Sequence, residues 1–238
     1  TLSATLMLPP SLAARAAQDV QPYLVRLVCE LRQHDAQLFI DVSLENTVCD
    51  HRLRLLINSD IRTTESIASQ PFAVIRRPVT DAPADWRQHY REKPVDIETS
   101  EGIIAIEENN RSLIINSLGM KEFQICQNET AQIALTLFKS TGVLGRDDLD
   151  WRPGRASGIN NTVVNTPDAQ LLKPLHFSLT LALADRADPM TLRHLETRVT
   201  RQPFTWQNQT LNTLDNRLER FTLNFASRSL PETFSLLT

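Results

Sequence analysis

One short segment gathers most of the side chains suited to recognising a polar ligand. Between residues 146 and 155 the chain carries three arginines, three aspartates and a tryptophan, namely Arg146, Asp147, Asp148, Asp150, Trp151, Arg152 and Arg155. Guanidinium and carboxylate groups form paired hydrogen bonds to vicinal hydroxyls, guanidinium groups also bind carboxylates, and an indole ring stacks on a sugar. The alternative is an exposed loop whose acidic and basic side chains pair with each other, and composition alone favours that alternative.

No pattern for self-sufficient catalysis occurs in the sequence. The five histidines show no H-x-H, H-E-x-x-H or H-x-D spacing, which a zinc site with two neighbouring ligands would need. The chain also lacks a G-x-S-x-G elbow, a P-loop and a G-x-G-x-x-G pattern. We therefore expect no catalytic residue, no metal site and no cofactor within these 238 residues.

The overall composition is that of an ordinary globular protein. Hydrophobic residues make up 41% of the chain and charged residues 22%, and the net charge is −3. This balance lacks the basic footprint that nucleic-acid binding requires. Apolar runs are too short for a transmembrane helix, and Cys29, Cys49 and Cys126 have no CxxC spacing. We predict a cytoplasmic protein with reduced thiols and with neither nucleic acid nor membrane as a partner.

Alternation of apolar and polar side chains predicts many strands. It is clearest over residues 37–44, where Leu38, Ile40, Val42 and Leu44 share one face. Further strands are predicted at residues 24–31, 52–57, 72–75, 102–107, 111–116, 123–126, 131–138 and 175–183. The strands at 24–31, 37–44 and 52–57 are expected to form an antiparallel meander, and the polar run 107–111 a tight hairpin.

Only two helices are expected, at residues 11–19 and 189–200. Asp188 can cap the second, and Leu192, Leu195 and Val199 form its apolar stripe. We therefore predict an all-β fold, a large antiparallel β-sandwich of the supersandwich kind with one or two short helices. A single domain is expected to span residues 1–238.

Two long stretches, residues 78–96 and 141–174, have no regular pattern. The first holds Trp86, His89 and Tyr90, and the second holds the charged segment described above. Connections of this length are uncommon in compact domains and are often functional. We expect any functional surface to lie there.

Several motifs, taken in order, resemble the C-terminal β region of bacterial family 38 α-mannosidases. They are Val42-Ser-Leu-Glu-Asn46, Asp50-His-Arg-Leu-Arg-Leu55, Gly102-Ile-Ile-Ala-Ile-Glu107, Leu118-Gly-Met-Lys-Glu-Phe123, residues 136–149, Arg152-Pro-Gly-Arg-Ala156, Thr166-Pro-Asp-Ala-Gln170 and His176-Phe-Ser-Leu-Thr-Leu181. The resemblance runs from about Leu24 to Leu183, and it is carried by the order and spacing of the motifs together.

The resemblance implies that the chain is a fragment of a retaining glycosidase acting on α-mannosides, 2-O-mannosylglycerate among them. A divalent metal, zinc, and the catalytic carboxylates would lie in an N-terminal α/β domain that a helical bundle follows, both outside residues 1–238. The β domain would pack on the catalytic domain of the same polypeptide and contribute to the substrate cleft. On this basis Arg146, Asp147, Arg152 and Arg155 are the candidates for cleft or interdomain contacts, and the fragment alone is expected to be inactive.

Two other functions fit the same residues. An independent carbohydrate-binding module would expose a stripe of aromatic side chains, but the chain has only three Trp and two Tyr. A structural or oligomerisation domain would make no ligand contact. If the charged segment packs on a partner domain, the isolated chain exposes that surface, and we expect weak self-association into homo-oligomers.

Overall fold

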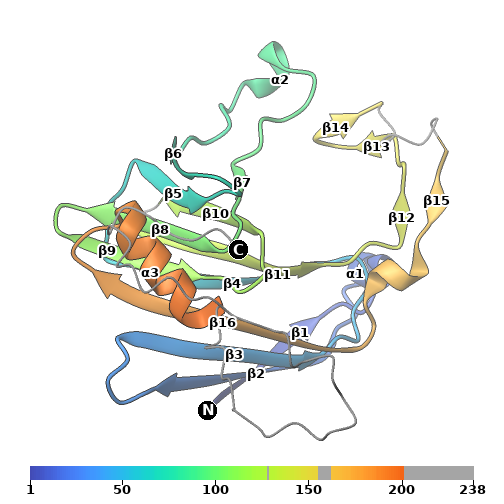
Figure 1. Ribbon diagram of the computed structural model, residues 1–238. Coiled ribbons are helices and arrows are strands. Elements are labelled where there is room, and N and C mark those ends of the chain that lie inside the picture. The colour runs from blue at the N-terminus through green and yellow to red at the C-terminus, as the bar shows by residue number, and fades with distance from the viewer. Residues whose placement is uncertain (128, 155–161, 201–238) are drawn as a thin grey trace, which may run out of the picture.

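A large antiparallel sheet forms one layer of the protein. The computed structural model describes residues 1–127, 129–154 and 162–200 (Figure 1). The sheet has eight strands, which in spatial order are β1 (Leu2–Leu8), β2 (Gln21–Leu31), β3 (Gln37–Glu45), β16 (Pro174–Ala184), β9 (Arg111–Asn116), β8 (Ile103–Glu108), β5 (Glu65–Ser69) and β6 (Val74–Pro78).

A smaller antiparallel sheet forms the second layer. Its four strands are, in spatial order, β4 (Arg52–Asn58), β11 (Ala131–Lys139), β10 (Glu122–Gln127) and β7 (Ile97–Thr99). Two separate ribbons pair β12 (Val143–Leu144) with β15 (Val164–Asn165) and β13 (Asp148–Leu149) with β14 (Arg152–Pro153). The predicted all-β sandwich is confirmed. Residues 201–238 lie outside the described part, so the extent of the domain over the whole chain stays a prediction.

The two sheets pack through the apolar faces of their strands. Ile40, Val42 and Leu44 of β3 are buried in one cluster with Phe123 and Ile133 of the smaller sheet. The alternation over residues 37–44 is therefore confirmed, because every second side chain of β3 faces the other sheet.

Helix α3 (Pro189–Thr200) covers the outer face of the large sheet (Figure 1). Its Leu192 and Leu195 pack with Ile103, Ile114 and Ala182 in a second apolar cluster. Since β8 contacts α3 on one side and the smaller sheet on the other, residues 103–106 are all buried. This explains why β8 is a continuous apolar run rather than an alternating one.

Both predicted helices are present, and each begins at a capping side chain. The carboxylate of Asp188 accepts hydrogen bonds from the backbone N–H of Met190 (3.0 Å) and Thr191 (3.1 Å), as the sequence predicts for α3. Ser11 caps α1 (Leu12–Ala17) by accepting from the N–H of Ala14. A third helix, α2 (Trp86–His89), is a single turn within the stretch of residues 78–96. One 3-10 helix, η1 (Pro167–Gln170), precedes β16.

The predicted meander of the strands at 24–31, 37–44 and 52–57 is wrong at its third member. Strand β4 leaves the large sheet and pairs with β11, so that Ile57 lies opposite Ile133. Between β3 and β4 the side chain of Val48 is buried and Asp50 adopts a φ of 52°, which turns the chain toward the second layer. Alternation specifies a face but not a neighbouring strand, which explains the error.

Three further features can be compared with the strands and the hairpin predicted from the sequence. The strand predicted at 72–75 begins only at Val74, because Phe72 lies in the preceding turn with 95% of its surface exposed. At the end of the strand predicted at 175–183, Leu183 is 78% exposed, whereas Ala182 on the opposite face is buried under α3. The hairpin between β8 and β9 is confirmed, with Asn109 at a φ of 55°.

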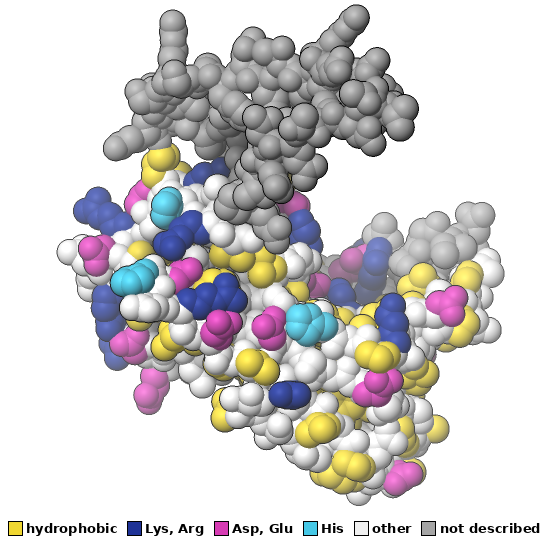
Figure 2. Space-filling model, turned by 60° about the horizontal axis from the view of Figure 1, so that its bottom comes forward, with side chains coloured by type: hydrophobic (Ala, Val, Ile, Leu, Met, Phe, Trp, Pro, Cys, Tyr) yellow, Lys and Arg dark blue, Asp and Glu magenta, His cyan; other side chains and the backbone are white. Residues whose placement is uncertain are grey.

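The surface is mixed in charge. Acidic and basic side chains are interspersed on the face drawn in Figure 2, and apolar side chains gather toward its lower right margin. His176 is exposed and its Nε2 lies 3.5 Å from the Asp41 carboxylate, as expected for a histidine on the polar face of a strand. No helix of the described residues is long and apolar enough to cross a membrane.

Candidate functional site

An arm leaves the sandwich after β11 and returns to it before η1. We define the arm as residues 141–154 and 162–166, which carry β12 to β15. In Figure 1 it projects beyond the ends of the two sheets, on the same side as the segment around α2. The arm and that segment belong to the two long stretches, residues 78–96 and 141–174, that have no regular pattern in the sequence. The fold brings these two stretches to the same side of the molecule.

The base of the arm is held by a carboxylate and a glutamine. Asp50 Oδ1 accepts hydrogen bonds from the N–H of Gly142 (2.8 Å) and from Nε2 of Gln170 (2.9 Å). Oε1 of Gln170 in turn accepts from the N–H of Asp50 (2.8 Å). This closed set ties the start of β4, the start of the arm and η1 to each other.

A buried asparagine extends this network into the core. Nδ2 of Asn46 donates to the carbonyl groups of Gln170 (2.9 Å) and Leu171 (3.1 Å), and its Oδ1 accepts from the Tyr23 hydroxyl (3.2 Å) and the Val48 N–H (3.3 Å). Only 1% of Asn46 is exposed. Burial also raises the pKa of Tyr23 to about 12. The amide is fully hydrogen-bonded in a place where an unmade bond is costly.

His51 and Ser140 join β4 to β11 at the same level. The N–H of Ser140 donates to the carbonyl of His51 (2.8 Å), and the N–H of His51 donates to Ser140 Oγ (3.2 Å). The imidazole lies edge-on between the rings of Tyr23 and Phe138, with centroids 5.9 and 5.0 Å away. Burial, followed by the positive charge of Arg15, lowers the pKa of His51 below its ordinary value. The fold therefore favours the neutral form of the ring, whose Nδ1 lies 3.2 Å from Ser140 Oγ.

Two glycines are required where the arm turns. A Cβ on Gly145 would lie 2.2 Å from the carbonyl oxygen of Thr162, and its φ is +79°. A Cβ on Gly142 would lie 2.4 Å from Nε2 of Gln170. Backbone cannot move aside as a flexible side chain can, so the requirement is stricter at Gly145.

At the tip of the arm, charged side chains connect it to the segment around α2. Nε of Arg152 lies 3.1 Å from the Glu92 carboxylate, and Arg87 lies 2.8 Å from Asp150. The Lys93 ammonium sits 4.0 Å above the ring of Trp151, and further contact comes from the N–H of Lys93, which donates to the Trp151 carbonyl (2.9 Å).

The predicted site residues fall at different places on the arm. Arg146 forms a paired contact with Asp148, with its Nε 2.7 Å from Oδ1, which raises the pKa of Arg146 and lowers that of Asp148. Asp147 is exposed, and its carbonyl accepts from the N–H of Gly154 (2.7 Å). Arg155 lies outside the described residues. Pairing among the loop charges does occur, as the alternative interpretation expects, but most of the pairs reach the segment around α2.

A pocket of about 410 Å³ lies between the base of the arm and its tip. Its polar lining comes from Asp50, Ser140, Thr141, Arg146 and Arg152. Its apolar lining comes from Leu12, Val143, Leu144 and Leu149. The volume suits a small molecule, and a few convergent polar groups in an otherwise apolar wall are typical of ligand sites.

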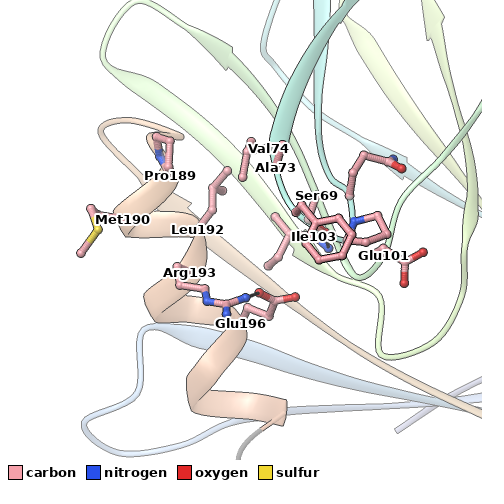
Figure 3. Close-up of a pocket in the computed structure, with 13 residues that line it drawn as sticks. Ser69, Ala73, Val74, Glu101, Ile103, Pro189, Met190, Leu192, Arg193 and Glu196 are labelled. Atoms are coloured by element: carbon pink, nitrogen blue, oxygen red, sulfur yellow. Dashed lines mark hydrogen bonds and ion pairs between the residues drawn. The ribbon is translucent and has the colours of Figure 1, made fainter. Parts of the chain in front are cut away.

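A larger cavity, about 520 Å³, lies between α3 and the turn that joins β5 to β6. Figure 3 shows Leu192 pointing toward Val74 and Ile103, with Arg193 and Glu196 paired along the wall at 3.1 Å. The floor belongs to the apolar cluster under α3, and the charged pair links neighbours on one helix. We assign this cavity to the packing of α3 rather than to ligand recognition.

Sequence reasoning missed the residues that position the arm. Asp50 and Gln170 are 120 residues apart, and Asn46 and Gln170 are 124 apart, so no local pattern links them. The one available signal was that all three lie in motifs that carry the family resemblance. The sequence also gave no indication that Glu92 is the partner of Arg152. No group of three or more potential metal ligands occurs in the described part of the chain.

Comparisons with known proteins agree with the motifs. No family model matches the chain. Over 142 residues, 60% of the chain, it is 25% identical to a curated protein of Halalkalibacterium halodurans named "Putative mannosylglycerate hydrolase". Two solved structures from Enterococcus faecalis, a glycosyl hydrolase family 38 protein and an α-mannosidase, each match 85% of the chain with TM-scores of 0.62 and 0.64. The chain therefore shares the fold of these two structures.

The resemblance read from the motifs is thereby confirmed. The chain is 19% and 20% identical to the two solved structures, so this likeness concerns the fold. It spans 14% of the curated relative and 23% and 22% of the solved chains. The activities of these longer proteins therefore enter only as proposals.

Proposed function

We propose that the chain is a non-catalytic C-terminal β domain of a retaining α-mannosidase, and that its arm completes the substrate cleft on the catalytic domain of the same polypeptide. The observation that carries this proposal is the arm itself. Its base is fixed in a buried polar network, while its tip, which carries charged residues, lies beyond the ends of the sheets. The similarity to a mannosylglycerate hydrolase supports α-mannosides as the substrate class, with 2-O-mannosylglycerate among them.

In this proposal the reaction is performed outside the chain. A divalent metal, zinc, would hold sugar hydroxyls on the catalytic domain, and two carboxylates there would carry out the double displacement of a retaining glycosidase. The β domain contributes binding and orientation, which raise the rate by holding the substrate in a productive position. On its own the chain is expected to be inactive.

Removal of the arm from the parent protein tests the proposal. Val143 lies opposite Asn165 in the β12–β15 ribbon, so a two-residue Asn-Gly turn can replace residues 144–164. The Thr166 N–H still donates to the Gly142 carbonyl, which preserves the base. We expect kcat/KM for 4-nitrophenyl α-mannoside to fall at least 100-fold with little change in Tm.

A matched control shortens a turn at the opposite end of the sheet, with Asn-Gly in place of residues 33–35 between β2 and β3. This variant is expected to retain the parent's turnover. Undiminished hydrolysis by the arm-deleted protein would show that the arm does not contribute to the cleft.

An independent carbohydrate-binding module has less support. Trp151 is 55% exposed, but the Lys93 ammonium already lies over its ring, which occupies a face that a sugar would need. Titration of the isolated chain with α-mannosides distinguishes the two functions, because only the module predicts saturable binding without the catalytic domain. We also propose a cytoplasmic location, which the free thiols of Cys29, Cys49 and Cys126 support.

A further inference from the structure

Two arginines line the pocket between the base and the tip of the arm. Arg146 and Arg152 both line it, whereas their carboxylate partners Asp148 and Glu92 are not among the lining residues. The acidic groups thus hold the arginines from outside the pocket. An arginine fixed by one carboxylate loses less side-chain freedom when it binds a second one.

Each arginine keeps hydrogen-bond donors for a ligand. Arg146 uses Nε and one terminal nitrogen on Asp148, and Arg152 uses Nε on Glu92. A guanidinium has five N–H donors, so unused terminal N–H groups remain on both side chains. Two forks around one small pocket suit a planar carboxylate, which accepts paired N–H bonds from arginine.

The third charged group of the lining, Asp50, does not cancel this preference. Its Oδ1 already accepts from the Gly142 N–H and from Gln170 Nε2, so that oxygen is committed to the base. Arg15 adds positive charge nearby by donating from Nη2 to the Asp50 carbonyl (3.4 Å). The Thr141 hydroxyl in the lining donates to the Val143 carbonyl (3.0 Å) and can still accept a hydrogen bond from a ligand hydroxyl.

We propose that this pocket binds the carboxylate of an acidic aglycone, such as glycerate, and that Arg146 and Arg152 thereby select acidic α-mannosides over neutral ones. The inference rests on the proposed function and deepens it by naming the part of the substrate that the arm recognises. In this assignment the two arginines are specificity-determining residues, while the bond-breaking groups lie on the catalytic domain.

The test compares two substrates that differ by one charge, mannosylglycerate and its amide, mannosylglyceramide. For the parent protein we expect the ratio of kcat/KM, acid over amide, to exceed 10. In Arg146→Ala and Arg152→Ala this ratio should fall at least tenfold, chiefly through KM for the acid. Arg152→Lys should recover only part of it, because an ammonium cannot form the paired contact.

Arg87→Ala is the matched control, since Arg87 lies at the same tip in an exposed pair with Asp150 but does not line the pocket. It should leave the ratio as in the parent. Equal ratios in the parent and both pocket variants, with neutral α-mannosides still hydrolysed, would overturn the carboxylate assignment alone. If the parent hydrolyses no α-mannoside, the proposed function fails instead.

Direct binding gives a readout that does not depend on turnover. In calorimetric titration of the parent protein we expect D-glycerate to bind, with affinity lost in both pocket variants, and glycerol not to bind. Stronger binding of inorganic phosphate than of D-glycerate, lost in the same variants, would mean that the pocket is a phosphate site and the assignment is wrong.

Discussion

At the base of the arm Asn46 is 1% exposed and fully hydrogen-bonded, whereas at its tip the side chains of Arg87 and Asp150 pair while 60% and 78% exposed. Both regions are polar, but their environments give those polar groups different consequences. A buried hydrogen bond left unmade carries a large penalty, while an exposed ion pair contributes little to stability. The base therefore determines where the arm points, and the tip remains free to contact something else.

The largest expected effect is at the base. Asn46→Ala would leave the Tyr23 hydroxyl, the Val48 N–H and the Gln170 carbonyl without their partner, so we expect the free energy of unfolding to fall by about 3 kcal/mol. Urea denaturation of the chain measures it. Asn58→Ala is the control, because Asn58 pairs with Gln132 on the exposed side of β4, and it should cost less than about 0.5 kcal/mol. Equal effects of the two variants would erase the distinction between base and surface.

The next largest loss in stability is expected at Gly145. Comparing it with Gly154 separates the cost of steric crowding from the cost of a positive φ. Gly145→Ala places a Cβ against the Thr162 carbonyl at a φ of +79°, and we expect a loss of about 2 kcal/mol. Gly154 has a φ of +69° but no atom within 4 Å of a Cβ, so Gly154→Ala should cost about 1 kcal/mol from conformation alone. Denaturation of both variants gives the difference, and a larger loss at Gly154 would contradict the described path of the arm.

Between pH 7 and pH 5, a pH dependence of stability should come from His51 at the base. The pKa of His51 is lowered from 6.5 in the fold, so the unfolded chain binds its proton more readily and stability falls as pH drops below about 6.5. Replacement of His51 by Phe should flatten stability between pH 7 and pH 5, although Phe also changes the packing. A steeper pH dependence in the Phe variant would exclude His51 as the cause.

The smallest effect on stability should be at the tip. Arg87→Ala removes an exposed ion pair with Asp150, and we expect a change of no more than about 0.5 kcal/mol in the free energy of unfolding. The change should shrink further in 1 M NaCl, since salt screens exposed charges. A loss of 2 kcal/mol or more would show that the tip, like the base, has a structural role.

The sequence predicted the sheets better than it predicted the site. Strands such as residues 37–44 and 111–116 were identified because one buried face, or two, leaves a regular apolar pattern. No apolar pattern in the sequence indicates that β4 belongs to the second sheet. The three residues of β7 and the Ser- and Ala-containing β5 were too short or too weakly patterned to recognise.

For the arm, the sequence identified the charged tip and missed the base. Clustered arginines and aspartates are visible locally, so Arg146 and Arg152 could be named. Asn46, Asp50 and Gln170 meet only after the chain has crossed both sheets, and their role depends on contacts that no spacing encodes. Motifs shared with family 38 proteins marked these residues without giving a reason. The reason is that they hold the arm in place.

The central claim is that a rigidly based arm completes the cleft of a longer mannosidase. Its most direct test is turnover of 4-nitrophenyl α-mannoside by the parent protein with residues 144–164 replaced by Asn-Gly, measured beside the thermal stability of the same sample. The account predicts a loss of at least 100-fold in kcat/KM with an almost unchanged Tm. Turnover equal to that of the intact parent, at the same Tm, would contradict it.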